Sequence, residues 1–176
     1  DPAALLGQKA DAMVESTRAM NGGRLRVIAD YEPLRRHPCL YDEARGWPRE
    51  WFDQTFLEAA IWGTEDAWRG LGTEGACELY SFPLFTPAFC ALFAEEIDSF
   101  HASGLPARRP NSMNNYGVVV TEIGMEPMID RLQREFLQPV ARAMFPGAGS
   151  HFDQHHSFVV RYKAGEDLGL DMHTDN

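Results

Sequence analysis

The last twenty residues of the chain carry the pattern that most restricts its fold. Residues 157–176 read SFVVRYKAGEDLGLDMHTDN, two runs of alternating apolar and polar residues separated by Ala164-Gly165-Glu166-Asp167. Successive side chains of a strand point to opposite faces, so Phe158, Val160 and Tyr162 share one face of the first run. A glycine flanked by small and acidic residues is typical of a turn. The segment therefore predicts two strands joined by a turn.

The second run ends in a pair of candidate metal ligands. If the strand stays extended, His173 and Asp175 share a face, with about 6–7 Å between their Cα atoms. An imidazole and a carboxylate at that spacing can converge on one ion. Two histidines and one carboxylate on one face of a metal form the ligand set of non-haem Fe(II) oxygenases. The bare tripeptide fits a solvated polar strand end better, so the prediction depends on the flanking strands.

Helix and turn signals divide the rest of the chain. A first helix is predicted from the capping pair Asp1-Pro2 to a stop at Asn21-Gly22-Gly23. Apolar residues at helical spacing predict further helices at 48–63, at 86–104 and from Glu126 onward, the last with a kink or break at Pro139. Short strands are predicted at 79–83 and 118–121, an extended segment at 24–48, and a loop or linker at 63–75. Together these elements predict an α+β fold.

Two clusters of side chains suit both a functional and a structural interpretation. Trp51, Trp62 and Trp68 would suit a ligand platform or a partner surface, but core packing is favoured because large aromatic residues dominate small cores. Three histidines, at positions 151, 155 and 156, resemble a second metal site, but their stretch leads into a strand, where they are not expected to converge.

Charge and composition restrict the classes of molecule that the chain is expected to bind. The formal net charge is −10 and the sequence pI is about 5.0, which argues against electrostatic binding of nucleic acid or of an anionic membrane. No apolar run approaches the length of a transmembrane helix, so no membrane insertion is expected. Cys39, Cys77 and Cys90 are an odd number without paired spacing, which favours reduced thiols and a soluble, intracellular protein.

With these segments in place, the chain resembles the 2-oxoglutarate/Fe(II)-dependent dioxygenases, and most of all their prolyl and lysyl hydroxylase-like members. The most specific motifs are Arg109-Pro110-Asn111 with 113–117, Phe136-Leu137-Gln138-Pro139, and 158–162 with His173-x-Asp175. The resemblance is continuous from about Leu79 to Asn176 and weaker from about Leu25. It implies a helical N-terminal extension at 1–75 and, at 76–176, the first half of a double-stranded β-helix (jelly-roll) oxygenase domain with supporting helices.

The resemblance also implies a site and a chemistry. His173 and Asp175 would be two Fe(II) ligands, and Tyr162 would contact 2-oxoglutarate; no catalytic residue beyond the metal ligands is expected. Three further residues would line the pocket: Asn114, Asn115 and Tyr116. The implied cofactors are Fe(II) and 2-oxoglutarate, with ascorbate as an additional candidate. The implied reaction is hydroxylation of an unactivated C–H bond, for which a prolyl or lysyl side chain of a protein is the expected substrate.

The chain departs from the family pattern in one respect. The third ligand, a histidine, and the Arg or Lys that binds the distal carboxylate of 2-oxoglutarate come from later strands, and the sequence ends at Asn176. An open sheet edge is also costly, so the chain is expected to be part of a longer polypeptide and to have little activity alone. The alternative is a truncated, inactive relative that serves as a structural subunit of a larger assembly. A nucleic-acid demethylase is disfavoured by the acidic charge.

Overall fold

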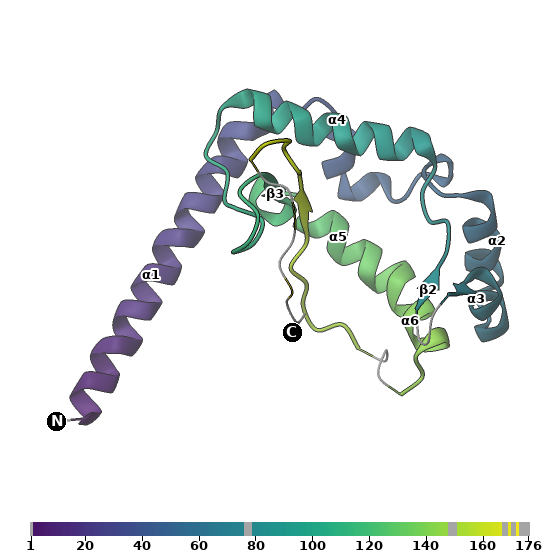
Figure 1. Ribbon diagram of the computed structural model, residues 1–176, viewed down its shortest axis with the longest axis horizontal. Helices are drawn as coiled ribbons and strands as arrows, with labels where there is room; N and C mark the ends of the chain where they lie inside the picture. The colour runs from purple at the N-terminus through teal and green to yellow at the C-terminus, as the bar shows by residue number, and fades with distance from the viewer. Residues whose placement is uncertain (1, 76–78, 148–150, 167–168, 170–171, 173–176) are drawn as a thin grey trace.

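The computed structural model describes residues 2–75, 79–147, 151–166, 169 and 172. It combines helices with two small antiparallel sheets, β1–β2 and β3–β4, which confirms the α+β prediction (Figure 1). The described residues form no closed barrel, so the jelly roll remains a prediction. The division of the chain near Gly75 also remains a prediction.

The helices and strands follow one another in this order. The first half contains α1 (Pro2–Tyr31), η1 (Glu32–Leu34), η2 (Pro38–Tyr41), η3 (Glu43–Arg45), η4 (Arg49–Trp51), α2 (Gln54–Trp62), α3 (Glu65–Leu71) and β1 (Thr73–Glu74). The second half contains β2 (Tyr80–Ser81), α4 (Pro87–Ser103), β3 (Gly117–Val119), η5 (Val120–Ile123), α5 (Glu126–Leu132), η6 (Gln133–Leu137), α6 (Gln138–Met144) and β4 (Phe158–Val160).

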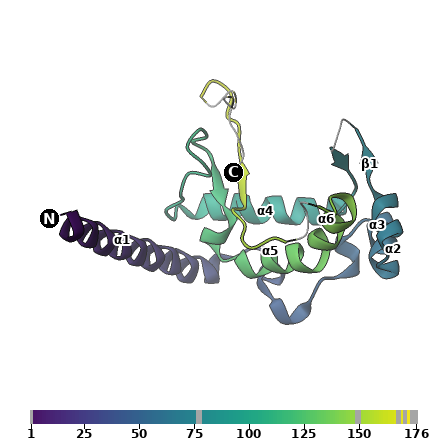
Figure 2. The same cartoon turned by 90° about the horizontal axis from the view of Figure 1, so that it is seen from below.

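Helix α1 is longer than its sequence predicts. It passes through Gly22 and Gly23, so the predicted stop there is wrong, as is the extended segment predicted to follow. Two helical glycines cost about 1 kcal/mol each relative to alanine, but contacts at the end of the helix offset this. Arg24 pairs with Glu126 at 3.1 Å, and the Tyr31 side chain is fully buried. The earlier turns project away from the body (Figures 1 and 2).

Tyr31 belongs to a buried polar cluster around Glu96 on α4. The Glu96 carboxylate accepts hydrogen bonds from the Tyr31 hydroxyl at 2.7 Å, from the Tyr41 hydroxyl at 3.0 Å and from the His37 backbone N–H at 2.6 Å. Burial, followed by the adjacent carboxylate, raises the pKa of both tyrosines. These bonds satisfy the buried carboxylate and fasten α1 and η2 to α4.

Side-chain caps explain where α2 and α3 begin. The helix predicted at 48–63 is interrupted at Phe52-Asp53, where the Asp53 carboxylate accepts from the Thr55 N–H and starts α2. The loop predicted at 63–75 is wrong, because Thr64 accepts from the Ala67 N–H and starts α3. The sequence signal for this helix is a threonine cap followed by two acidic residues in the first turn, Glu65 and Asp66.

The core is an aromatic cluster between these helices and α4 to α6. Phe56 is fully buried and lies 5.6 Å from Trp68 and 5.9 Å from Phe136, centroid to centroid. Trp51 is also buried, so core packing is confirmed for two of the three tryptophans. It is wrong for Trp62, which is 75% exposed at the end of α2.

The later helices follow the sequence closely. Helix α4 begins at Pro87 with Thr86 as its cap and ends at Gly104 in the left-handed region, as predicted. The helix that begins at Glu126 widens into the π-helical turns of η6 just before Pro139. Proline cannot donate the helical hydrogen bond, so the predicted interruption is confirmed. None of the helices in the described part of the chain combines the length and apolar character needed to cross a membrane.

Candidate active site

The candidate site is built on the ladder between β3 and β4. Gly117, Val118 and Val119 pair with Val160, Val159 and Phe158, and the Arg161 N–H donates to the Tyr116 carbonyl at 3.0 Å. Gly117 has φ of +141°, and a Cβ atom there would collide with the Val159 carbonyl. Only glycine therefore lets the two backbones approach this closely.

The two faces of this ladder have different surroundings. Val118 is buried in the hydrophobic core, and its cross-strand partner Val159 packs against the same core. On the opposite face, Val119 is also buried, whereas its cross-strand partner Phe158 is 38% exposed and Tyr162 is 55% exposed. Strand β3 is therefore buried on both faces, and the exposed apolar or aromatic side chains of the ladder are those at 158 and 162, on the face opposite Val159.

An exposed ion pair attaches the residue that follows β4 to α4. The Arg161 guanidinium pairs with Asp98, and the guanidinium lowers the pKa of this carboxyl group. Burial, reinforced by Arg161, lowers the pKa of the neighbouring His101. Strand alternation places Arg161 on the same face as Val159, but its partner lies 63 positions earlier in the chain. The sequence pattern could not have identified that partner.

The predicted turn after β4 is present in the described residues. The Glu166 N–H donates to the Lys163 carbonyl at 3.0 Å, and Gly165 has φ of +82°. The Lys163 ammonium lies 5.0 Å from the Tyr116 ring centroid and pairs with Glu166 at 2.6 Å. The Tyr116 hydroxyl also donates to Glu166. Lys163, followed by Tyr116, lowers the pKa of Glu166.

The structure places the predicted site residues in different surroundings. Tyr162 lies on the open face of β4, whereas Tyr116 is tied to the turn through Glu166. Asn115 is exposed, and Asn114 is fully buried with its Oδ1 accepting from Asn111 at 3.1 Å and its Nδ2 without a partner. The two predicted metal ligands, His173 and Asp175, lie outside the described residues.

The histidines before β4 make local contacts. The His155 Nε2 lies 3.0 Å from Asp130, and its Nδ1 lies 2.9 Å from the Ser157 hydroxyl. The His156 Nε2 lies 3.2 Å from the Pro110 carbonyl. Within the part of the chain that the structure describes, no three His, Cys, Asp or Glu side chains are grouped to hold a metal ion. His155 and His156 thus hold the segment before β4 against α5 and the loop at Pro110.

Comparison with known proteins identifies the family. The OGFOD2-like domain matches residues 27–150, which is more than half of the chain. The chain belongs to the OGFOD2-like domain family. The resemblance to the 2-oxoglutarate/Fe(II)-dependent oxygenases is thereby confirmed, and the matched region includes β3 and the helices that cover it.

Relatives of this OGFOD2-like chain are named as oxygenase domain-containing proteins or as a hydroxylase. It is 33% identical over 158 residues to the 2-oxoglutarate and iron-dependent oxygenase domain-containing protein CP2 of Arabidopsis thaliana, covering 87% of this chain and 39% of the relative. It is 44% identical over 100 residues to the 2-oxoglutarate and iron-dependent oxygenase domain-containing protein 2 of Homo sapiens, covering 56% and 29%. A more distant match, 24% identical, is the rat multifunctional procollagen lysine hydroxylase and glycosyltransferase LH3, with 88% of this chain and 21% of the relative covered. The chain thus spans less than half of each of these proteins, and no solved structure matches it.

Proposed function

We propose that this chain supplies the first part of the active site of a 2-oxoglutarate- and Fe(II)-dependent dioxygenase. The family assignment and the names of the relatives support this class of enzyme. The observation that carries the proposal is the exposure of Phe158 and Tyr162 on one face of the chain at β4. Val159, on the other face, packs against the core, and the exposed Tyr162 would be available to a cofactor.

The residue types present fit this pair of cofactors. An imidazole at His173 and a carboxylate at Asp175 are suitable ligands for Fe(II), and a histidine from a later strand would complete the set. The turn at 164–166 reverses the chain after β4, so a following antiparallel strand would return these two ligands toward the start of β4. Iron with 2-oxoglutarate supplies the oxidation of a C–H bond by O₂, with succinate and CO₂ as co-products.

The role of this chain is to position and shield these groups. Tyr162 would donate its hydroxyl to a carboxylate of 2-oxoglutarate, which fixes the orientation of that molecule. The apolar side chains of Phe158 and Val160 precede it on the same face of β4 and would exclude water from the site. The ion pair between Arg161 and Asp98 would keep the opposite face of the strand, which bears Tyr162, directed away from α4.

The substrate is proposed to be a protein side chain, prolyl or lysyl. One distant relative is named a procollagen lysine hydroxylase, and its match covers 88% of this chain. At 24% identity this supports the substrate class more weakly than the reaction class.

Succinate release tests the reaction on the full-length protein, with Fe(II) and 2-oxoglutarate supplied. His173→Ala and Asp175→Ala are each expected to abolish release and to lower bound iron, because each removes a ligand. His151→Ala, which removes an exposed histidine outside β4, is the matched control and is expected to keep both. Unchanged iron content in His173→Ala would show that the metal site lies elsewhere.

A further inference from the structure

Two adjoining hollows lie where the second half of α1 meets the loop that follows α4 (Figure 1). Their volumes are about 470 and 380 Å³. They share four lining residues: Met20, Arg24, Arg108 and Glu122. We call the two hollows together the α1 groove. None of the described residues 157–166 lines it, so it is separate from Tyr162.

Arginine side chains are concentrated in the α1 groove. Four of the chain's 16 lysine and arginine residues line it, although the formal net charge of the chain is −10. The four are Arg24, Arg26, Arg108 and Arg109. All but Arg24 are exposed, so their charges can be reached by a ligand. The groove is therefore a basic region on an acidic molecule.

Two of these guanidinium groups, those of Arg26 and Arg109, form no ion pair among the residues that the structure describes. The Arg26 Nε donates to the Gly22 carbonyl at 3.2 Å. Arg109 donates to the carbonyls of Asn114 and Ser112, at 3.3 and 3.1 Å. Carbonyl groups carry no net charge, so both positive charges remain uncompensated.

The acidic residues of the groove do not cancel these charges. The Glu122 carboxylate pairs with Arg108 at 3.1 Å, and its side chain is only 14% exposed. Arg24 pairs with Glu126 at 3.1 Å. Two uncompensated guanidinium groups therefore face a single remaining carboxylate, that of Asp30, which lines only the smaller hollow.

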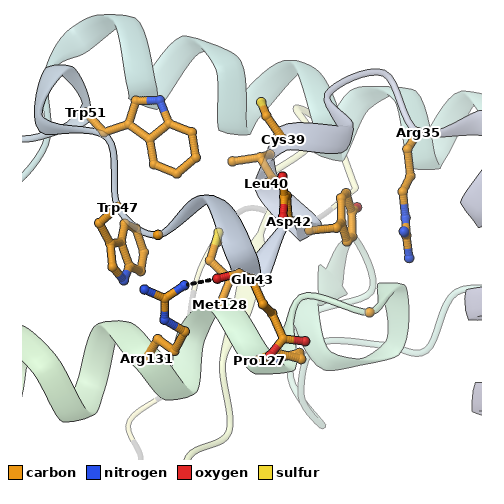
Figure 3. A pocket seen from close by; sticks show the side chains of 13 residues that line it. Arg35, Cys39, Leu40, Asp42, Glu43, Trp47, Trp51, Pro127, Met128 and Arg131 are labelled. Atoms are coloured by element: carbon orange, nitrogen blue, oxygen red, sulfur yellow. Dashed lines mark hydrogen bonds between the residues drawn. The ribbon is translucent and has the colours of Figure 1, made fainter.

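The cavity drawn in Figure 3 has a different balance of charge. Its volume is about 180 Å³, and its lining includes two arginines, Arg35 and Arg131, and two acidic residues, Asp42 and Glu43. Equal numbers of opposite charges give it no preference for an anion. The α1 groove, with its excess of positive charge, suits an acidic ligand better.

The smaller hollow also offers apolar surface. Met20 is 51% exposed on α1, and Pro106 and Ala107 are exposed on the facing loop. Gly23 lines the same hollow, and nothing lies within 4 Å of the position that a Cβ atom would take there. The glycine thus leaves open space in which an apolar side chain can lie beside the arginines.

We propose that the α1 groove binds a short peptide segment of a partner protein, in which acidic side chains flank an apolar one. The carboxylates would accept hydrogen bonds from Arg26 and Arg109, and the apolar side chain would contact Met20 and Pro106. Double-stranded DNA carries a charge about every 1.7 Å and would extend over the acidic remainder of the surface, so a short peptide is the better match. The proposal is independent of the proposed oxygenase activity.

Binding of labelled peptides to the full-length protein provides the test. Three rhodamine-labelled peptides are compared by fluorescence anisotropy: Gly-Glu-Glu-Leu-Glu-Glu-Gly, the same peptide with glutamine for every glutamate, and the same peptide with serine for leucine. The first is expected to bind, the second about tenfold more weakly or less, and the third severalfold more weakly. Because salt screens exposed charges, binding of the first peptide should also weaken as ionic strength rises.

A charge placed inside the groove tests its location. Gly23→Glu directs a carboxylate into the open space beside the arginines and is expected to weaken binding of the acidic peptide about tenfold or more. Leu25→Glu adds the same charge to α1 at a residue that is 60% exposed and lines neither hollow, so it should bind like the parent protein.

A second pair of variants changes only exposed arginines. Arg26→Gln combined with Arg108→Gln is expected to weaken binding about tenfold, whereas Arg109 is kept because it holds the carbonyls of its own loop. Arg18→Gln combined with Arg49→Gln is the matched control, because both residues are exposed and line neither hollow. Circular dichroism confirms that each variant is folded.

Four results would overturn the proposal. The acidic and glutamine peptides could bind alike, or each folded variant could bind like its control. The full-length protein could bind no acidic peptide, which would mean that the groove is closed by its own later residues or has no affinity for acids. A thymidine oligonucleotide could displace the acidic peptide at a lower concentration than unlabelled peptide does, which would assign the groove to nucleic acid.

Discussion

The helical part of the molecule and the β3–β4 ladder are held together in different ways. Around Phe56 the helices share an aromatic cluster, and Glu96 joins α1, η2 and α4 through three hydrogen bonds. Strand β4 has three ladder residues, of which Val159 packs against the core, and an ion pair between exposed side chains, Arg161 and Asp98, follows it. The first region is stabilised by burial throughout, whereas in the second only β3 is buried and β4 is at most half-buried.

The two regions therefore meet different requirements. The helical part stabilises the fold, and the exposed side chains at β4 remain available for ligand binding. A cofactor site needs one face of the sheet left open, and that face cannot also contribute to the core. Substitutions in the helical part should therefore change the free energy of unfolding, whereas substitutions on the open face of β4 should change ligand binding alone. Single substitutions in the two regions test this separation.

The largest effect is expected for Phe56→Ala. The side chain is fully buried among aromatic rings, so its removal should lower the free energy of unfolding by about 3–5 kcal/mol. Urea denaturation followed by circular dichroism measures the change. Ile61→Ala on the same helix removes a side chain that is 65% exposed and should change stability by less than about 0.5 kcal/mol. Similar losses in the two variants would contradict the description of the core.

A smaller and more local effect is expected for Gly117→Ala. The added Cβ atom would meet the Val159 carbonyl at a positive φ, which should cost more than about 1 kcal/mol and open the β3–β4 ladder. Gly22→Ala is the matched control, because nothing lies near that glycine inside α1 and the change should stabilise the helix by up to about 1 kcal/mol. Hydrogen exchange of the Arg161 amide, which donates to the Tyr116 carbonyl across the ladder, reports its opening. Normal protection in Gly117→Ala would mean that the backbones can separate without loss.

The sequence predicted local structure well where one signal acted alone. Thr86-Pro87 and Gly104 fixed both ends of α4, and the alternating run before the glycine turn identified β4. It failed where tertiary packing opposed a local preference: α1 continues through Gly22-Gly23 because Tyr31 is anchored at Glu96. Contacts between distant segments, such as Arg161 with Asp98, cannot be read from local patterns.

A weaker and pH-dependent effect is expected for Asp98→Asn. Because Arg161 lowers the pKa of Asp98 from its usual value of 3.8, the contribution of the pair is fully present above that value and is lost as the pH falls through the lowered pKa. The Arg161 amide should therefore exchange faster in the variant at neutral pH, and the difference should disappear in strong acid. Glu95→Gln, an exposed change on the same helix that affects Arg36 and His37, should leave this amide unchanged. A difference that persists in strong acid would rule out the ion pair as its cause.

The smallest effect on stability, and the most informative for function, is expected for Tyr162→Phe. The side chain is 55% exposed, so the free energy of unfolding should change by less than about 0.5 kcal/mol. If its hydroxyl donates to 2-oxoglutarate, affinity for that cofactor in the full-length protein should fall about tenfold, the value of one charge-assisted hydrogen bond. Tyr116→Phe is the matched control, because that hydroxyl is bound to Glu166 at the turn and should not affect affinity. If only Tyr116→Phe weakened cofactor binding, the cofactor would lie on the face of the ladder that bears Tyr116. The residues that bind the cofactor would then not be separate from those that stabilise the fold.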